Sequence, residues 1–298
     1  MIFFIEVVLS GVMAGVMYSL VALGFGLIFK ASGVFNFAQG VMALFAALTL
    51  VGFMDKFGMP VWLAIAGTIL VMIALAWLIE RLMLQHLVNQ EPIILFMATI
   101  GLAYVLEGFG DILWGSDVKL LDIGIPQGAS DWMLDNFDIY VEKLEVFAAA
   151  TAAVMVAVLS VFFHKTRTGR ALRAVADDHQ AALSVGISLR TIWVIVWSVS
   201  GVVALVAGIM WGSKSGVQFS LSLIALKALP VLILGGFTSI PGAIIGGLII
   251  GVGEKVAEIY VGPMVGGAIE NWFAYMLALA FLLFRPQGLF GERIIERV

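Results

Sequence analysis

The sequence contains no cysteine and few charged residues. Asp, Glu, Lys and Arg together make up 12% of its 298 residues, against roughly 25% in a typical soluble domain. The missing thiols exclude structural disulfides, thiolate nucleophiles and Cys-ligated zinc. The scarcity of charge, beside a hydrophobic content of 62%, is typical of a protein that crosses a membrane several times.

The sequence also lacks the residues of a nucleotide or metal site. No Gly is followed directly by Lys, so there is no Walker A phosphate loop. The histidines His86, His164 and His179 all fall in expected loops without metal-ligand spacing. We therefore expect a chain with no catalytic residue, metal or bound cofactor, and we do not expect nucleic acid as a partner.

Long apolar runs separated by short polar breaks fill most of the chain. A helix needs about 20 mostly apolar residues to cross a bilayer. This pattern predicts one all-α membrane domain, 1–298, a polytopic transmembrane helical bundle of about eight to nine spans. The expected spans are 2–29, 37–54, 62–79, 93–114, 144–163, 191–211, 223–237, 242–253 and 272–284.

The C-terminal third is less regular. The runs 223–237 and 242–253 reach only about half to three-quarters of a standard span. Short runs interrupted by Gly and Pro are typical of broken or re-entrant helices near a transport path. The same pattern also fits a tight helical hairpin packed through glycines, and the sequence leaves both open. The glycines concerned are Gly235, Gly236, Gly242, Gly246, Gly247 and Gly251.

Charge is distributed unevenly between two loops. The loop 115–143 is acidic, whereas the segment 165–190 carries the largest basic cluster in the chain. Lys and Arg near membrane ends favour the cytoplasmic side. We therefore expect 165–190 in the cytoplasm, 115–143 in the periplasm and the N-terminus outside. The basic residues are Lys165, Arg167, Arg170, Arg173 and Arg190.

The basic segment also has helix signals. Thr168 can cap a helix over 169–176, and Asp177 or Asp178 can cap a second over 179–185, which Gly186 would end. Apolar side chains at helical spacing would face the membrane domain and leave a polar face for a partner. A solvated loop that only obeys topology is the alternative interpretation.

A few polar residues interrupt the spans. Lys227, five residues into its apolar run, is a candidate for a transport path, although a lysine there can also snorkel to the interface. Asn36 and Gln39 can line a path at a broken helix or act as an ordinary cap. Ser239 is a weaker candidate.

Glu107 and Asp111 carry a competing hypothesis. A stand-alone secondary transporter or channel for a small polar solute would use them, with Lys227, to bind coupling ions or substrate. They lie near a span end beside Trp114, where interfacial acids facing water are inexpensive. An intramembrane enzyme is the weakest hypothesis, because it would need a carboxylate pair or histidine cluster deep in the membrane.

Four motifs occur in one order along nearly the whole chain. They are SGVFNFAQG at 32–40, TGRALRAVA at 168–176, LGGFTSIPGA at 234–243 and LFRPQGLFG at 283–291. Together they resemble the permease subunits of bacterial branched-chain amino acid importers driven by ATP-binding cassette subunits. Two departures are Gln39, where the family often has His, and Phe237–Thr238, where the family is commonly richer in glycine.

The resemblance implies partners, a location and a mechanism. It implies a multi-pass subunit of the bacterial inner membrane that moves branched-chain or related small amino acids inward by alternating access. Family members usually work with a second permease, identical or related, with two ATPase subunits that use ATP and Mg, and with a periplasmic binding protein. Permeases for urea or short amides share the architecture. The implied coupling residues are Gly169, Arg170, Arg173, Ala174 and Asp177.

Overall fold

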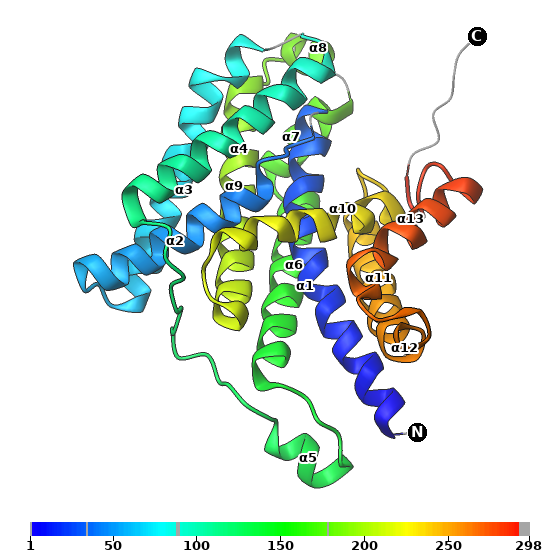
Figure 1. Cartoon of the computed structure of the whole chain (residues 1–298). Coiled ribbons are helices and arrows are strands. Elements are labelled where there is room, and N and C mark those ends of the chain that lie inside the picture. Colours follow the sequence, from blue (N-terminus) through cyan, green and yellow to red (C-terminus); the bar gives the residue numbers. More distant parts are fainter. Residues whose placement is uncertain (1, 34, 88–89, 178, 292–298) are drawn as a thin grey trace. The chain divides into compact units, whose positions relative to one another are not determined.

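The computed structural model describes residues 2–33, 35–87, 90–177 and 179–291, and α-helices dominate it (Figure 1). The described parts contain no β-strand, only two isolated bridges. Three short 3-10 helices are η1 (Leu84–His86), η2 (Phe219–Leu223) and η3 (Ile269–Asn271). The α-helices are α1 (Ile2–Ser32), α2 (Gln39–Phe57), α3 (Val61–Leu82), α4 (Pro92–Trp114), α5 (Asp131–Phe137), α6 (Lys143–Lys165), α7 (Arg167–Asp177), α8 (His179–Ser184), α9 (Leu189–Ser215), α10 (Ile224–Gly235), α11 (Ile240–Tyr260), α12 (Gly262–Val265) and α13 (Phe273–Phe284).

Seven stretches of the described chain are helical, long and apolar enough to cross a membrane: α1, α2, α3 with η1, α4, α6, α9 and α11. Two shorter apolar stretches, Phe219–Gly235 and Phe273–Phe284, lie in the C-terminal third. These findings confirm the predicted polytopic all-α fold and its irregular end. One boundary was wrong, because α11 continues past Gly253 to Tyr260. The charged residues that follow Gly253 are paired within the fold, as described below.

The chain divides into two compact units. Unit 1 comprises Met1–Ala22, Gly124–Val156 and Leu226–Val298, and unit 2 comprises Leu23–Ile123 and Ala157–Ala225. Three helices, α1, α6 and α10, therefore contribute residues to both units.

Unit 2 is built around α2, which packs against α3, α4 and α9. The helix is buried from Gln39 to Gly52. Small residues let α9 approach it closely, because a Cβ atom on Gly208 would lie 2.5 Å from the carbonyl oxygen of Ala43. A helix enclosed on several sides needs no polar face, which fits the almost entirely apolar sequence from Val41 to Gly52.

In unit 1, the first half of α1 packs tightly on α11. A Cβ atom on Gly15 would lie 2.4 Å from the Gly247 carbonyl oxygen, and one on Gly11 would lie 2.9 Å from that of Gly251. This confirms that the Gly11–Gly15 pair permits close helix approach, since only glycine leaves room for the neighbouring backbone.

Three of the six glycines, Gly235, Gly242 and Gly246, pack as the hairpin interpretation predicted. The other three do not, because Gly247 and Gly251 pack on α1 and Gly236 packs on Gly291. A Cβ atom on Gly235 of α10 would lie 2.2 Å from the Gly242 carbonyl oxygen of α11, and one on Gly246 would lie 2.6 Å from that of Val231. After α13, the chain returns to the hairpin, where Leu289 N–H donates to the Leu234 carbonyl (2.8 Å).

Candidate functional site

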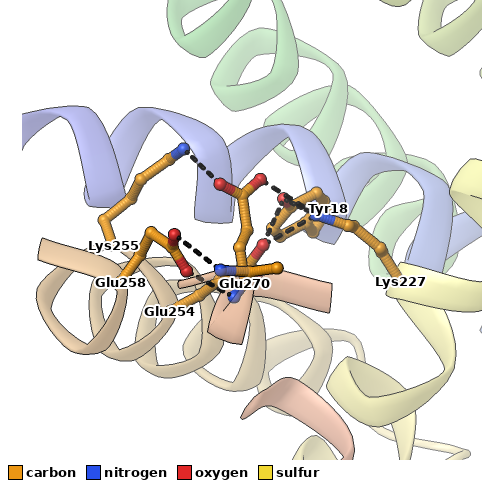
Figure 2. Close-up of polar contacts among 7 residues, drawn as sticks. Tyr18, Lys227, Glu254, Lys255, Glu258 and Glu270 are labelled. Atoms are coloured by element: carbon orange, nitrogen blue, oxygen red, sulfur yellow. Dashed lines mark hydrogen bonds and ion pairs between the residues drawn. The ribbon is translucent and has the colours of Figure 1, made fainter. Parts of the chain in front are cut away.

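A cluster of charged side chains lies within unit 1 (Figure 2). Lys227 of α10 donates from Nζ to Glu254 Oε1 of α11 at 2.8 Å and to Glu270 Oε1 of η3 at 3.0 Å. Lys255 donates to the other oxygen of Glu270 at 3.1 Å, and the Tyr18 hydroxyl of α1 donates to Glu254 Oε1 at 3.2 Å. We call Tyr18, Lys227, Glu254, Lys255 and Glu270 the charge cluster.

The side chains of the charge cluster differ in exposure, from buried to partly exposed. The Glu254 side chain is 1% exposed, whereas Lys227 is 26% and Glu270 is 33% exposed. Two ammonium groups face two carboxylates, so the cluster carries no net charge when all four are ionised. Glu254 Oε2, however, is buried and accepts no hydrogen bond from any residue that the structure describes. Such a buried orphan acceptor is costly and marks a site of strain or function.

Local geometry explains how the cluster forms. The close α1–α11 contact brings Tyr18 against Glu254, and the α10–α11 hairpin brings Lys227 to the same place. Glu258, one turn further along α11, accepts from the backbone N–H groups of Ala268 (3.2 Å) and Glu270 (2.8 Å). This carboxylate holds the loop that presents Glu270.

The second candidate site is α7 with α8 in unit 2, which we call the coupling segment after its predicted role. α7 is strongly amphipathic, and its apolar residues Leu172 and Val175 are fully buried. The cap differs from the prediction: the helix begins at Arg167, and Thr166 rather than Thr168 accepts from the Gly169 N–H (2.9 Å). The second helix, α8, ends near Gly186 as expected, where φ is +83°.

The predicted coupling residues have different environments. Gly169 is buried against the end of α6, where a Cβ atom would lie 2.3 Å from the Phe162 carbonyl oxygen. Arg173 is half-buried and donates to the Phe163 carbonyl oxygen (2.7 Å), so it ties α7 to α6. Arg170 is exposed, and Ala174 is half-buried. The side chain of Asp177 lies outside the described part of the chain.

Within the coupling segment, α8 and the residue that follows it expose apolar side chains. Leu183 is 52% and Val185 is 73% exposed. Leu183 also borders a cavity of about 260 Å³, which is lined in addition by the Glu80–Arg190 ion pair (3.0 Å). Glu80 is buried near the end of α3 and Arg190 lies in the first turn of α9, so this pair joins two spans close to the coupling segment.

Two of the predicted path residues form a neutral amide cluster in unit 2. Gln39 Oε1 accepts from the Ser200 hydroxyl of α9 (2.8 Å), and the Asn36 side chain accepts from the Ala38 N–H (3.1 Å). Gln39 also packs on Gly24 of α1, where an added Cβ would lie 2.2 Å from its Nε2. We call Asn36, Gln39 and Ser200 the amide cluster. Its members are buried, and their role on the path stays a prediction.

Ser239, Glu107 and Asp111 belong to neither cluster. Ser239 accepts from the Gly242 N–H (3.0 Å) as the cap of α11. Glu107 is half-buried and Asp111 is exposed on α4, in unit 2. Lys227 belongs to unit 1, with acidic partners on α11 and η3. Among the described residues there is no group of three or more His, Asp or Glu that can hold a metal ion.

Sequence reasoning found Lys227 but missed its partners. The expected span 242–253 ends directly before Glu254 and Lys255, and Glu270 lies outside every expected span. A signal was present, because charges just beyond a run can pair with a lysine inside a neighbouring span. Pairing Lys227 with them needed the hairpin geometry, which the sequence left open.

Comparisons of sequence match nearly the whole chain to known proteins. The family model of branched-chain amino acid transport system permease components matches residues 7–285. The high-affinity branched-chain amino acid transport permease LivH of Salmonella typhimurium is 27% identical over 100% of this chain and 98% of its own. The corresponding BraD of Pseudomonas aeruginosa is 27% identical over 99% and 98%. The solved structure of PsaBC from Streptococcus pneumoniae in complex with Fab covers 92% of this chain and 89% of its own, with a TM-score of 0.48 and 14% identity.

Proposed function

This chain belongs to the family of permease components of branched-chain amino acid transport systems, and we propose that it imports branched-chain or related small amino acids. It is a multi-pass subunit of the inner (plasma) membrane. In the proposal, ATP hydrolysis in partner subunits drives alternating access, and this chain catalyses no reaction and binds no cofactor.

The observation that carries the proposal is the coupling segment. Its inner face is fixed to the membrane helices by Gly169, Leu172 and Arg173. Its outer face offers a cation and exposed apolar side chains, the combination that a protein partner can bind. Because α7 and α8 are anchored to α6 and α9, a force applied to this surface moves the spans on either side.

The proposed assembly follows from the missing nucleotide site. ATP and Mg would be bound by two ATPase subunits, which dock on the coupling segments of this chain and of a second permease. A periplasmic binding protein would deliver the amino acid and carry most of the selectivity. The path would run between the two permeases, with Lys227, Asn36, Gln39 and Ser239 as the polar candidates of this chain.

A transport assay in proteoliposomes tests the proposal. The chain is reconstituted with the subunits that co-purify with it, and uptake of radiolabelled leucine is measured with ATP at the ATPase side. We expect uptake that requires ATP and the binding protein and that an ion gradient cannot replace. Uptake by the chain alone under a proton or sodium gradient would instead establish a stand-alone carrier and refute the importer.

A further inference from the structure

The charge cluster lies in unit 1, outside the coupling segment, and it brings two lysines and two glutamates together. Lys227 lies within the short apolar helix α10 and meets partners from α1, α11 and η3. Ionisable residues inside a membrane domain face water-filled paths or one another, and they are retained at a cost. Lys227 and Glu270 are the partly exposed members of this cluster, and Glu254 is its buried member.

We propose that the charge cluster binds the α-ammonium and α-carboxylate groups of the amino acid during its passage. This inference rests on the proposed function and assigns the substrate contact within it. In the structure, the Lys227 ammonium group lies beside Glu254, at the position that the substrate ammonium group would take. The Glu270 carboxylate lies beside Lys227, at the position that the substrate carboxylate would take.

Hydrogen-bonding capacity supports this assignment. An α-ammonium group brings three N–H donors, and Glu254 Oε2 is a buried acceptor with no donor among the described residues. A substrate carboxylate can replace Glu270 on Lys227, because Glu270 keeps Lys255 as a partner at 3.1 Å. No bond is made or broken in this exchange, and each charged group keeps an opposite charge beside it.

Charge balance then predicts selectivity for the zwitterion. The four ionised groups sum to zero, so a net-neutral amino acid enters without leaving an unpaired buried charge. An amine or a carboxylic acid with the same side chain brings one uncompensated charge, which is expensive in a partly buried site. The cluster should therefore bind leucine and reject both 3-methylbutylamine and 4-methylpentanoate.

The competing explanation is a purely structural ion-pair network that ties α1, α10, α11 and η3 together. Thermal unfolding of the purified full-length chain in detergent distinguishes the two. Leucine, the amine and the acid are each titrated to about 100 mM, and a ligand that binds only the folded chain raises the melting temperature. We expect leucine alone to raise it, with saturation.

The variants Glu254→Gln and Asp131→Asn sharpen this test. Both remove one carboxylate charge from unit 1, but Asp131 pairs with Lys143 at 2.8 Å, outside the charge cluster. Loss of one charge-assisted hydrogen bond should weaken leucine binding to Glu254→Gln about tenfold or more. Asp131→Asn should keep the wild-type leucine affinity.

Two results would overturn the inference. One is a wild-type melting temperature that leucine does not change, and the other is an equal leucine response in wild type and Glu254→Gln. Either result leaves the importer intact if the proteoliposomes still take up leucine with ATP. Conversely, loss of ATP-driven uptake in the wild-type assembly refutes the proposed function without bearing on the binding measured in detergent.

Discussion

The charge cluster of unit 1 and the amide cluster of unit 2 pair their buried polar groups in different ways. Both clusters place polar side chains among helices that are mostly apolar. In the amide cluster, neutral groups satisfy one another, with Gln39 and Ser200 at 2.8 Å. In the charge cluster, Lys227 holds two carboxylates, and Glu254 Oε2 has no donor among the described residues.

This difference separates a structural joint from a site that can exchange partners. Neutral hydrogen bonds contribute about 1 kcal/mol each and leave little reason to rearrange. Buried ion pairs add little net stability, yet removal of one partner is strongly destabilising. The charge cluster is therefore the more sensitive place, and the following predictions rank perturbations by expected effect.

Replacement of Lys227 by Met should have the largest effect. The substitution leaves Glu254 and Glu270 facing each other without Lys227, and breaking a buried pair in this way costs about 3–5 kcal/mol. Thermal unfolding of the purified chain should show a large drop in melting temperature. The double variant Lys227→Met with Glu254→Gln should recover much of it, and a wild-type melting temperature for Lys227→Met would contradict the account.

Replacement of Gly15 by Ala should have the next largest effect. The new methyl group would lie 2.4 Å from the Gly247 carbonyl oxygen, so α1 must move away from α11 and carry Tyr18 from Glu254. Overpacking of this kind costs about 1–3 kcal/mol. Gly101→Ala on α4 is the matched control, because nothing lies within 4 Å of its added Cβ atom. Equal unfolding curves for the two variants would contradict the claim that the close α1–α11 contact stabilises the fold.

Replacement of Ser200 by Ala tests the amide cluster. Its hydroxyl lies 2.8 Å from Gln39 Oε1 and 3.1 Å from the Gly24 carbonyl oxygen, and the loss of a neutral hydrogen bond costs about 1 kcal/mol. The free energy of unfolding in denaturant should fall by that amount, well below the change for Lys227→Met. A larger loss for Ser200→Ala than for Lys227→Met would reverse the comparison.

Replacement of Asp131 by Asn should have the smallest effect. Asp131 pairs with Lys143 at 2.8 Å, but its side chain is 79% exposed. The hydrogen bond from Lys143 lowers the pKa of the Asp131 carboxyl. Any stabilisation is therefore present above the ordinary carboxyl pKa and lost as pH falls through the lowered one. Melting temperatures of wild type and Asp131→Asn should agree at pH 7, since exposed pairs contribute little.

The sequence predicted the spans well, because length and apolar content alone decide whether a helix can cross a bilayer. It failed where charge interrupts an apolar run. The expected span ends at Gly253, since nothing in that run indicates that Lys227 of another helix pairs with Glu254. The cap of α7 was shifted for a related reason: Thr166 and Thr168 are both good caps, and only the approach of α6 selects Thr166.

The candidate site was only partly predictable. Lys227 was visible as a lone charge in an apolar run, and the Gly11–Gly15 pair was visible as a packing motif. Their connection was not, because it joins residues more than 200 positions apart through the contact of α1 with α11. Gln39 was a polar residue at a span start, and its burial against Ser200 depends equally on tertiary packing.

The most direct test of the account is the number of leucine molecules imported per ATP hydrolysed by the complete transporter. Arg170→Glu, on the exposed face of the coupling segment, should reduce ATP hydrolysis and import together, because the ATPase docks poorly. Arg170→Lys should preserve both. Glu254→Gln should instead lower import while ATP hydrolysis continues, so that its ratio falls below that of wild type. A wild-type ratio and import rate for Glu254→Gln, or normal import by Arg170→Glu, would contradict the division of roles between the two units.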